Sequence, residues 1–135
     1  MKPGEGRIDP KLVGKGDCYI ANYHLQGMMQ ESSIARAKGE VFLCHGILTA
    51  PDLYVLMKPG TQFMHAWVEH KHDEHGWTMH DASLGEYTWH TKKVFYEQMK
   101  PRAVYRMTRT EAKYHVARTG KIGRWDLFTD HRGII

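Results

Sequence analysis

The sequence predicts a single α+β domain, in which a helix near the N-terminus packs on a small antiparallel sheet and another helix follows near the C-terminus. Apolar residues recur at helical spacing over residues 18–30. Residues 63–69 and 77–83 alternate between apolar and polar and flank a charged turn, which is the pattern of a β-hairpin. Thr108 and Glu111 match a capping box at the start of a further helical segment.

The first helix is expected to begin beside a cysteine. Residues 1–16 are rich in glycine, proline and charge, so we expect a flexible N-terminal arm, followed by one domain over residues 17–135. Asp17 is a suitable N-cap, and the residues that recur at helical spacing after it are Ile20, Ala21, His24, Leu25, Met28 and Met29. This assignment places Cys18 in the first turn of the helix.

The other elements are predicted from apolar runs and from the glycines and prolines that end them. They are a buried strand over residues 40–48, a loop with a short strand over 54–57, the hairpin, a short helix over 91–99, a strand over 104–107, and a helix over 108–119 that stops at Gly120.

The composition argues against several classes of protein. The chain has 135 residues and a formal charge of +4, and its lysines and arginines are spread along it, so nucleic-acid binding is not expected as its main function. The start of the chain lacks the apolar core of a signal peptide, and no run of residues is long and apolar enough to span a membrane. We expect a cytoplasmic protein in which Cys18 and Cys44 are reduced; a disulfide between them is the alternative.

Cys18 is the candidate nucleophile. The free backbone N–H groups and the dipole at a helix N-terminus both stabilise a thiolate. The N–H of Cys18 itself is suited to donate to the oxyanion formed in acyl transfer. The alternative for a single cysteine is a small apolar side chain in the core.

The hairpin predicts a base for this nucleophile. If the turn is centred on Asp73, His65 lies directly opposite Asp81 on the same face, with Cβ atoms about 4.5–5.5 Å apart. An aspartate at that distance can orient the imidazole ring. We expect water to be excluded from the pair by Phe63, Trp67, Trp77 and Met79.

The chain has ten histidines, and five of them crowd the hairpin region: His70, His72, His75, His80 and His90. The sequence contains neither a Cys-x-x-Cys pair nor a His-Glu-x-x-His helix. We therefore expect no metal site and no cofactor. The charged tip over residues 71–76 is expected to be mobile and to flank the cleft of the site.

Three short motifs resemble those of transglutaminase-like cysteine enzymes. The segment HAWVE, which begins at His65, is similar to their catalytic-histidine motif; GDCY, with Cys18 at a helix start, precedes it, and HDAS, with Asp81, follows it. The order Cys, His, Asp also matches that superfamily, whose core resembles papain. The resemblance implies a papain/transglutaminase-like fold and a catalytic triad of Cys18, His65 and Asp81.

The chain is also similar to a family of small proteins from tailed bacteriophages. The matching segments are residues 16–19, His45 with Gly46, residues 65–69, Asp81 with Ser83, residues 105–112 and residues 120–126. The resemblance covers most of the chain and implies a phage protein acting in the host cytoplasm. Trp125 and Asp126 are expected to pack the tail onto the domain, with no chemical role.

Four further residues are candidates for contact with a substrate. Papain-like enzymes complete the oxyanion hole with a glutamine before the cysteine, and the segment KLVGKGDC has none. Tyr19, Asn22 or a backbone amide is therefore the candidate second donor. His45 is either a second histidine of the site or a core histidine beside a glycine that permits close approach. Trp67 is a candidate wall of the cleft, and Glu69 is expected to be solvated or salt-bridged near the hairpin.

The leading functional hypothesis is a cysteine hydrolase that acts on an amide, isopeptide or thioester bond of a protein or peptide, such as a host protein. With an amine as acceptor the same acyl-enzyme would give an acyl transferase. The alternative is a non-enzymatic phage protein that binds a host protein, for example to inhibit a defence system. Neither the substrate nor the oligomeric state is predicted by the sequence.

Overall fold

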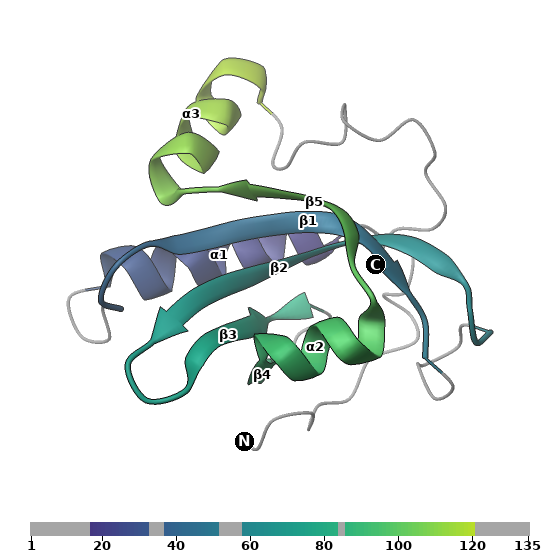
Figure 1. Ribbon diagram of the computed structural model, residues 1–135. Coiled ribbons are helices and arrows are strands. Elements are labelled where there is room, and N and C mark those ends of the chain that lie inside the picture. Colours follow the sequence, from purple (N-terminus) through teal and green to yellow (C-terminus); the bar gives the residue numbers. More distant parts are fainter. Residues whose placement is uncertain (1–16, 33–36, 52–57, 84–85, 121–135) are drawn as a thin grey trace.

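The computed structural model describes residues 17–32, 37–51, 58–83 and 86–120. Within these ranges the chain forms three helices and a five-stranded antiparallel sheet of order β4-β3-β2-β1-β5, which confirms the predicted α+β class (Figure 1). The elements are α1 (Asp17–Glu31), β1 (Val41–Thr49), β2 (Gln62–His72), β3 (Gly76–Asp81), β4 (Thr88–Thr91), α2 (Lys92–Met99), β5 (Arg102–Met107) and α3 (Arg109–Thr119). The expected arm over 1–16, the strand over 54–57 and the packing of Trp125 and Asp126 lie outside the described residues.

The sheet has helices on both faces, and the alternation of side chains along the strands decides which residues meet which helix. Figure 1 shows α1 lying along β1 and β2. On that face Ala66 packs against Cys18 and Tyr19, and a second cluster around Leu43 joins α3 to the sheet. The opposite face packs against α2 and holds the main core: Cys44, Leu48, Ala50, Phe63, Trp67, Met79, Phe95 and Met99.

Strand β4 was not predicted from the sequence, because its four residues are too few to show alternation. It pairs with β3, from Thr78 opposite Thr91 to Asp81 opposite Thr88. The predicted strand over residues 104–107 is longer than expected, since β5 begins at Arg102.

A bulge in β5 lies against Gly46 of β1. His45 pairs with Tyr105 and Ile47 pairs with Arg102, so two residues of β5 face the single residue Gly46. A Cβ atom on Gly46 would lie 3.0 Å from the carbonyl oxygen of Arg102 and 3.2 Å from the ring of Trp67. This is the close approach that a glycine permits and a larger residue would obstruct.

The ends of α3 follow the predicted signals closely. In α3 the Thr108 hydroxyl accepts a hydrogen bond from the N–H of Glu111, and the Glu111 carboxylate accepts one from the N–H of Thr108, which is the expected capping box. Gly120 ends that helix with a φ of 71°. The first helix begins at Asp17, so this residue is inside the helix rather than before it. No helix in the described parts of the chain is long and apolar enough to cross a bilayer.

Cys44 lies in the main core as a free thiol. Cys18, at the start of α1, is also a buried free thiol, in the cluster on the other face of the sheet. Burial, with the carboxylate of Glu69 nearby, raises the pKa of the Cys44 thiol well above its ordinary value. We therefore expect Cys44→Ala to leave the reactivity of Cys18 unchanged and to lower the free energy of unfolding by about 1–2 kcal/mol. Urea unfolding and mass spectrometry after iodoacetamide treatment check both parts. Alkylation of Cys44 in the folded protein as fast as that of Cys18 would contradict the prediction.

Candidate active site

The candidate triad lies where β2 and β3 part. Their ladder runs from His72 opposite Gly76 to Val68 opposite His80, and Asp81 is the last residue of β3. The N-terminal turn of α1 packs against β2 here, since Cys18 and Ala66 share an apolar cluster. Three elements that are far apart in the sequence therefore converge at this end of the hairpin.

The predicted register of the hairpin is wrong, although the predicted contact forms. The ladder centres the turn on Glu74 rather than Asp73, so His65 lies diagonally from Asp81 instead of directly opposite. A shift of about two residues keeps both side chains on one face, and diagonal neighbours remain within reach of long side chains. His65 Nε2 and Asp81 Oδ2 are 2.6 Å apart.

The charges around His65 hold a proton on its ring. Burial lowers the pKa of His65, but the carboxylate of Asp81, together with a smaller contribution from Cys18, outweighs burial and raises this pKa to about 10. Burial would raise the pKa of Asp81, but His65 and neighbouring hydrogen-bond donors lower it to about 2. At neutral pH the pair is therefore an imidazolium and a carboxylate, and both ring nitrogens carry hydrogen.

Cys18 is the second ionisable group that acts on His65. It lies in the first turn of α1 and is wholly buried, and its hydrogen bonding and its charge both raise the pKa of His65. Nε2 of the ring bonds to Asp81, so Nδ1 is the nitrogen available to the thiol. Among the described residues, Nδ1 has no hydrogen-bond partner within the usual distance. A cysteine, a histidine and an aspartate in this order can perform nucleophilic acyl transfer.

Asp81 is fixed from the side away from His65. Its Oδ1 atom accepts hydrogen bonds from the N–H of Ser83 at 2.8 Å and from the hydroxyl of Ser83. The side-chain amide of Asn22 donates to the same oxygen at 3.0 Å. The other oxygen, Oδ2, is thereby left for the imidazole, and the carboxylate cannot rotate without breaking these bonds.

Asn22 ties the nucleophile's helix to the aspartate. Its side chain is wholly buried, and its Nδ2 lies within hydrogen-bonding distance of the Ala66 carbonyl oxygen as well as of Asp81. Its Oδ1 accepts a hydrogen bond from the N–H of Ala82 at 3.0 Å. Because protein acceptors surround its two amide hydrogens, Asn22 is placed to position Asp81 rather than to bind an oxyanion.

Tyr19 and His45 lie together on the α1 face of the sheet. Their ring centroids are 5.3 Å apart, and the His45 ring is 5.4 Å from that of Tyr105. His45 is wholly buried and pairs with Ala66 across the strands, and this burial is compatible with both of its expected roles, because Cys18 and His65 are buried to the same extent. Burial and the charge of Cys18 raise the pKa of the Tyr19 phenol. Tyr19 therefore keeps its hydroxyl hydrogen and remains a candidate donor near the thiol.

Two of the four aromatic and apolar residues expected around the His65 ring have ring contacts with it. The rings of His65 and Trp67 are nearly parallel, with 15° between their planes and 6.4 Å between their centroids. The centroid of Phe63 is 6.0 Å from that of His65. Trp77 is 39% exposed, and its ring lies 6.2 Å from that of Phe42 in a tilted arrangement near the opposite end of β3, so its expected place beside the triad is wrong.

Glu69 was expected to be solvated or salt-bridged, and it is salt-bridged but wholly buried. Its carboxylate accepts hydrogen bonds from Trp67 Nε1 at 2.9 Å, from the Tyr96 hydroxyl at 2.7 Å and from Arg106 Nε at 2.9 Å. Lys92 Nζ is 3.3 Å away. Burial would raise the pKa of Glu69, but these donors lower it. Alternation along β2 already places Glu69 on the same face as Trp67, which is the signal in the sequence that indicated its burial.

The hairpin tip does not flank the triad. Its turn, residues 73–75, is at the end of β3 away from Asp81, and there the rings of His72 and His75 lie 4.9 Å apart. Among the described residues, no group of three or more His, Cys, Asp and Glu side chains is placed to hold a metal ion.

Ser83→Ala is expected to lower the free energy of unfolding by about 1 kcal/mol above pH 4, because it removes a donor to the Asp81 carboxylate. The pKa of Asp81 is below its ordinary value of 3.8, so the stability from its charge is present above that pH and is lost as the pH falls through about 2. The difference between wild type and variant should therefore vanish at low pH. Urea unfolding at a series of pH values measures it; an equal loss at low and neutral pH would show that only packing had changed.

Comparison with known proteins adds no family assignment, since no family model, no curated protein and no solved structure matches this chain.

Proposed function

We propose that this protein is a cysteine hydrolase that cleaves an amide, isopeptide or thioester bond in a protein or peptide. Cys18 is the nucleophile, His65 transfers the proton and Asp81 orients the ring. The observation that carries the proposal is the hydrogen bond of 2.6 Å between His65 Nε2 and Asp81 Oδ2. The other ionisable group that acts on the same imidazole ring is Cys18. The resemblance of HAWVE to the histidine motif of transglutaminase-like enzymes supports it.

In the proposed reaction the Cys18 thiolate attacks the carbonyl carbon, and N–H groups of the first turn of α1 donate to the developing oxyanion. The imidazolium of His65 gives its Nδ1 proton to the leaving amine or thiol as the bond to carbon breaks. Water then attacks the acyl-cysteine and gives a proton to the neutral ring, and the thiolate of Cys18 leaves. Asp81 keeps hydrogen on Nε2 throughout, so that Nδ1 is always the nitrogen that acts. An amine in place of water would make the product a transferred acyl group.

The burial of the site favours a second candidate function. Cys18 is 0% exposed and His65 is 1% exposed, so a substrate carbonyl reaches the thiol only if the surrounding residues move. A phage accessory protein that binds a host protein through its surface would need no such opening. In that case Cys18, His65 and Asp81 would serve as a buried polar cluster of the fold.

Acylation by a small activated thioester separates the two functions. Wild type, Cys18→Ala and Cys44→Ala are incubated with the thioester near neutral pH, and mass spectrometry locates the acyl group. The hydrolase predicts an acyl group on Cys18 that water removes, its loss in Cys18→Ala and its retention in Cys44→Ala. A folded wild-type protein in which Cys18 stays unmodified over hours would overturn the proposed activity and favour the binding protein.

A further inference from the structure

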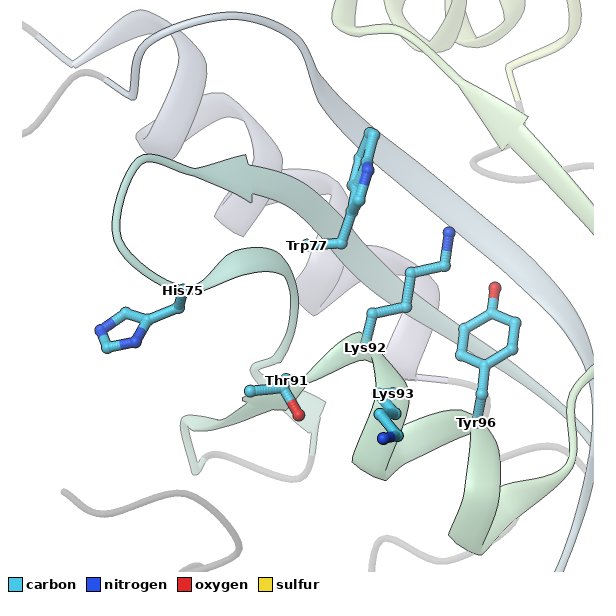
Figure 2. A pocket seen from close by; sticks show the side chains of 6 residues that line it. All are labelled: His75, Trp77, Thr91, Lys92, Lys93 and Tyr96. Atoms are coloured by element: carbon cyan, nitrogen blue, oxygen red, sulfur yellow. The ribbon is translucent and has the colours of Figure 1, made fainter.

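A groove lies at the other end of β3 from the candidate triad. It has a volume of about 580 Å³ and is lined by His75, Trp77, Thr91, Lys92, Lys93 and Tyr96 (Figure 2). Trp77 and Asp81 are near opposite ends of β3, which separates the groove from the triad by about 13 Å along the strand. A volume of this size suits a small ligand or a few side chains of a partner.

The groove carries a net positive charge. Its lining includes two lysines and no acidic residue. Glu74 borders the groove, with its carboxylate 4.0 Å from the ring of His75, but its side chain is 81% exposed and therefore screened by solvent. The carboxylate of Glu69 is buried, and Arg106 already neutralises it through a bond of 2.9 Å to Oε1. Lys92 shares that oxygen at the longer distance of 3.3 Å, so it is a cation beyond the one that the carboxylate needs. Lys93 adds a second positive charge to the lining.

Lys92 is held in a fixed place with its ammonium between two aromatic side chains. Figure 2 shows it between Trp77 and Tyr96, and its Nζ is 5.0 Å and 5.2 Å from the two ring centroids. An ammonium has three hydrogens, so a bond to Glu69 leaves two for a ligand. Because the ammonium lies between the two rings, a flat base cannot stack between them, whereas a carboxylate can meet the ammonium directly.

We propose that this groove binds an acidic segment of a peptide or protein, in which a carboxylate contacts Lys92 and Lys93 and an adjacent apolar side chain rests on Trp77. The carboxylate complements the charge of the groove, and the apolar neighbour covers the exposed part of the tryptophan. This binding proposal depends on the proposed hydrolase function in one respect, which is that the partner is a peptide or protein. Under that function, the groove recognises a part of the substrate away from the bond that is cleaved.

Calorimetric titration with two blocked peptides tests the proposal. The first is acetyl-Gly-Glu-Phe-Glu-Gly-amide, and the second has glutamine in place of both glutamates. At low ionic strength the acidic peptide is expected to bind at least about tenfold more tightly than the neutral one. Lys93→Gln should weaken the acidic peptide severalfold, and Lys92→Met should weaken it more. Lys113→Gln removes the same charge from α3, away from the groove, and should change nothing.

Three results would overturn the proposal. They are equal affinity for the two peptides, unchanged binding by both Lys93→Gln and Lys92→Met, and tighter binding of adenosine monophosphate or inorganic phosphate than of the acidic peptide. If Lys92→Met fails to fold, NMR spectra of the backbone amides of the wild-type protein, recorded during the titration, provide a second test. The largest changes in amide chemical shift must then centre on Trp77 and Lys93. Binding is measured without turnover, so a protein that binds the peptide but is not acylated at Cys18 would refute the hydrolase alone.

Discussion

Replacing His65 by alanine is expected to slow the alkylation of Cys18 by iodoacetamide at least about a hundredfold near neutral pH. The imidazolium stabilises the thiolate, which is the form that attacks the reagent, and the partly buried carboxylate of Asp81 keeps the ring charged. The pKa of His65 is raised to about 10, so the imidazole ring remains charged throughout the neutral range. Stopped samples analysed by mass spectrometry give the rate at Cys18 separately from that at Cys44.

Asp81→Asn supplies the matched control for this prediction. The amide keeps the shape of the side chain but loses the charge, so the pKa of His65 should fall towards its ordinary value of 6.5 and alkylation should slow less than in His65→Ala. Asp81 acts through the ring, and the double variant should therefore be scarcely slower than His65→Ala alone. Circular dichroism must show that each variant is folded. Alkylation of Cys18 at the wild-type rate in folded His65→Ala would contradict the assignment of His65 as its partner.

Glu69→Ala is expected to lower the free energy of unfolding by about 3–5 kcal/mol, the largest loss of stability predicted for any single change. The substitution leaves three donors without their acceptor, from Trp67, Tyr96 and Arg106. Burying donors without a partner costs their desolvation, and the side chain of Trp67 also loses the bond that fixes its ring beside His65. Urea unfolding monitored by circular dichroism measures the loss.

Two control variants show whether the loss of stability comes from the charge of Glu69, from its packing, or from the removal of any charged side chain. Glu69→Gln retains the shape and one acceptor, so it should destabilise less than the alanine variant. Lys38→Ala breaks an ion pair with Asp73 at 3.5 Å in which both side chains are mostly exposed, and the stability should change by less than about 0.5 kcal/mol. A loss from Glu69→Ala no larger than that from Lys38→Ala would show that the buried network contributes nothing.

The features predicted correctly from the sequence depend on short segments. The capping box of α3 needs only Thr108 and Glu111, and the helix that begins beside Cys18 is indicated by a helical repeat within one segment. The closeness of His65 and Asp81 follows from the alternation of two strands in one hairpin. Each of these signals lies within one short segment, so it can be recognised from the sequence without knowing how the segments pack.

The register of the hairpin could not be predicted from the same signals. Turns centred on Asp73 and on Glu74 both leave the apolar residues of β2 and β3 on the core face, because the two registers differ by about two residues. The choice between them depends on contacts with other elements. These include the pairing of β3 with β4, a strand of four residues that gives no alternation signal of its own.

The surroundings of Glu69 depend on residues distant in sequence. Its partners Tyr96, Lys92 and Arg106 come from α2 and β5, and their approach to β2 does not follow from any one segment. The same holds for the groove that Lys92 and Tyr96 line. Trp77 was misplaced for a different reason: it precedes Asp81 by four residues on the same strand, which puts it about 13 Å away along β3.

The order of the strands has a consequence for the nascent chain. Among the described strands β1 leaves the ribosome first and finds one neighbour soon after in β2, but its other neighbour is β5, with Leu43 opposite Met107. Until Met107 has been synthesised, one edge of a strand with the apolar sequence VFLC remains without its partner. The meander from β1 to β4 can form from local contacts, whereas β5 must join from the far end of the chain. The interval before β5 joins is therefore when the chain is most exposed to edge-to-edge association with another copy.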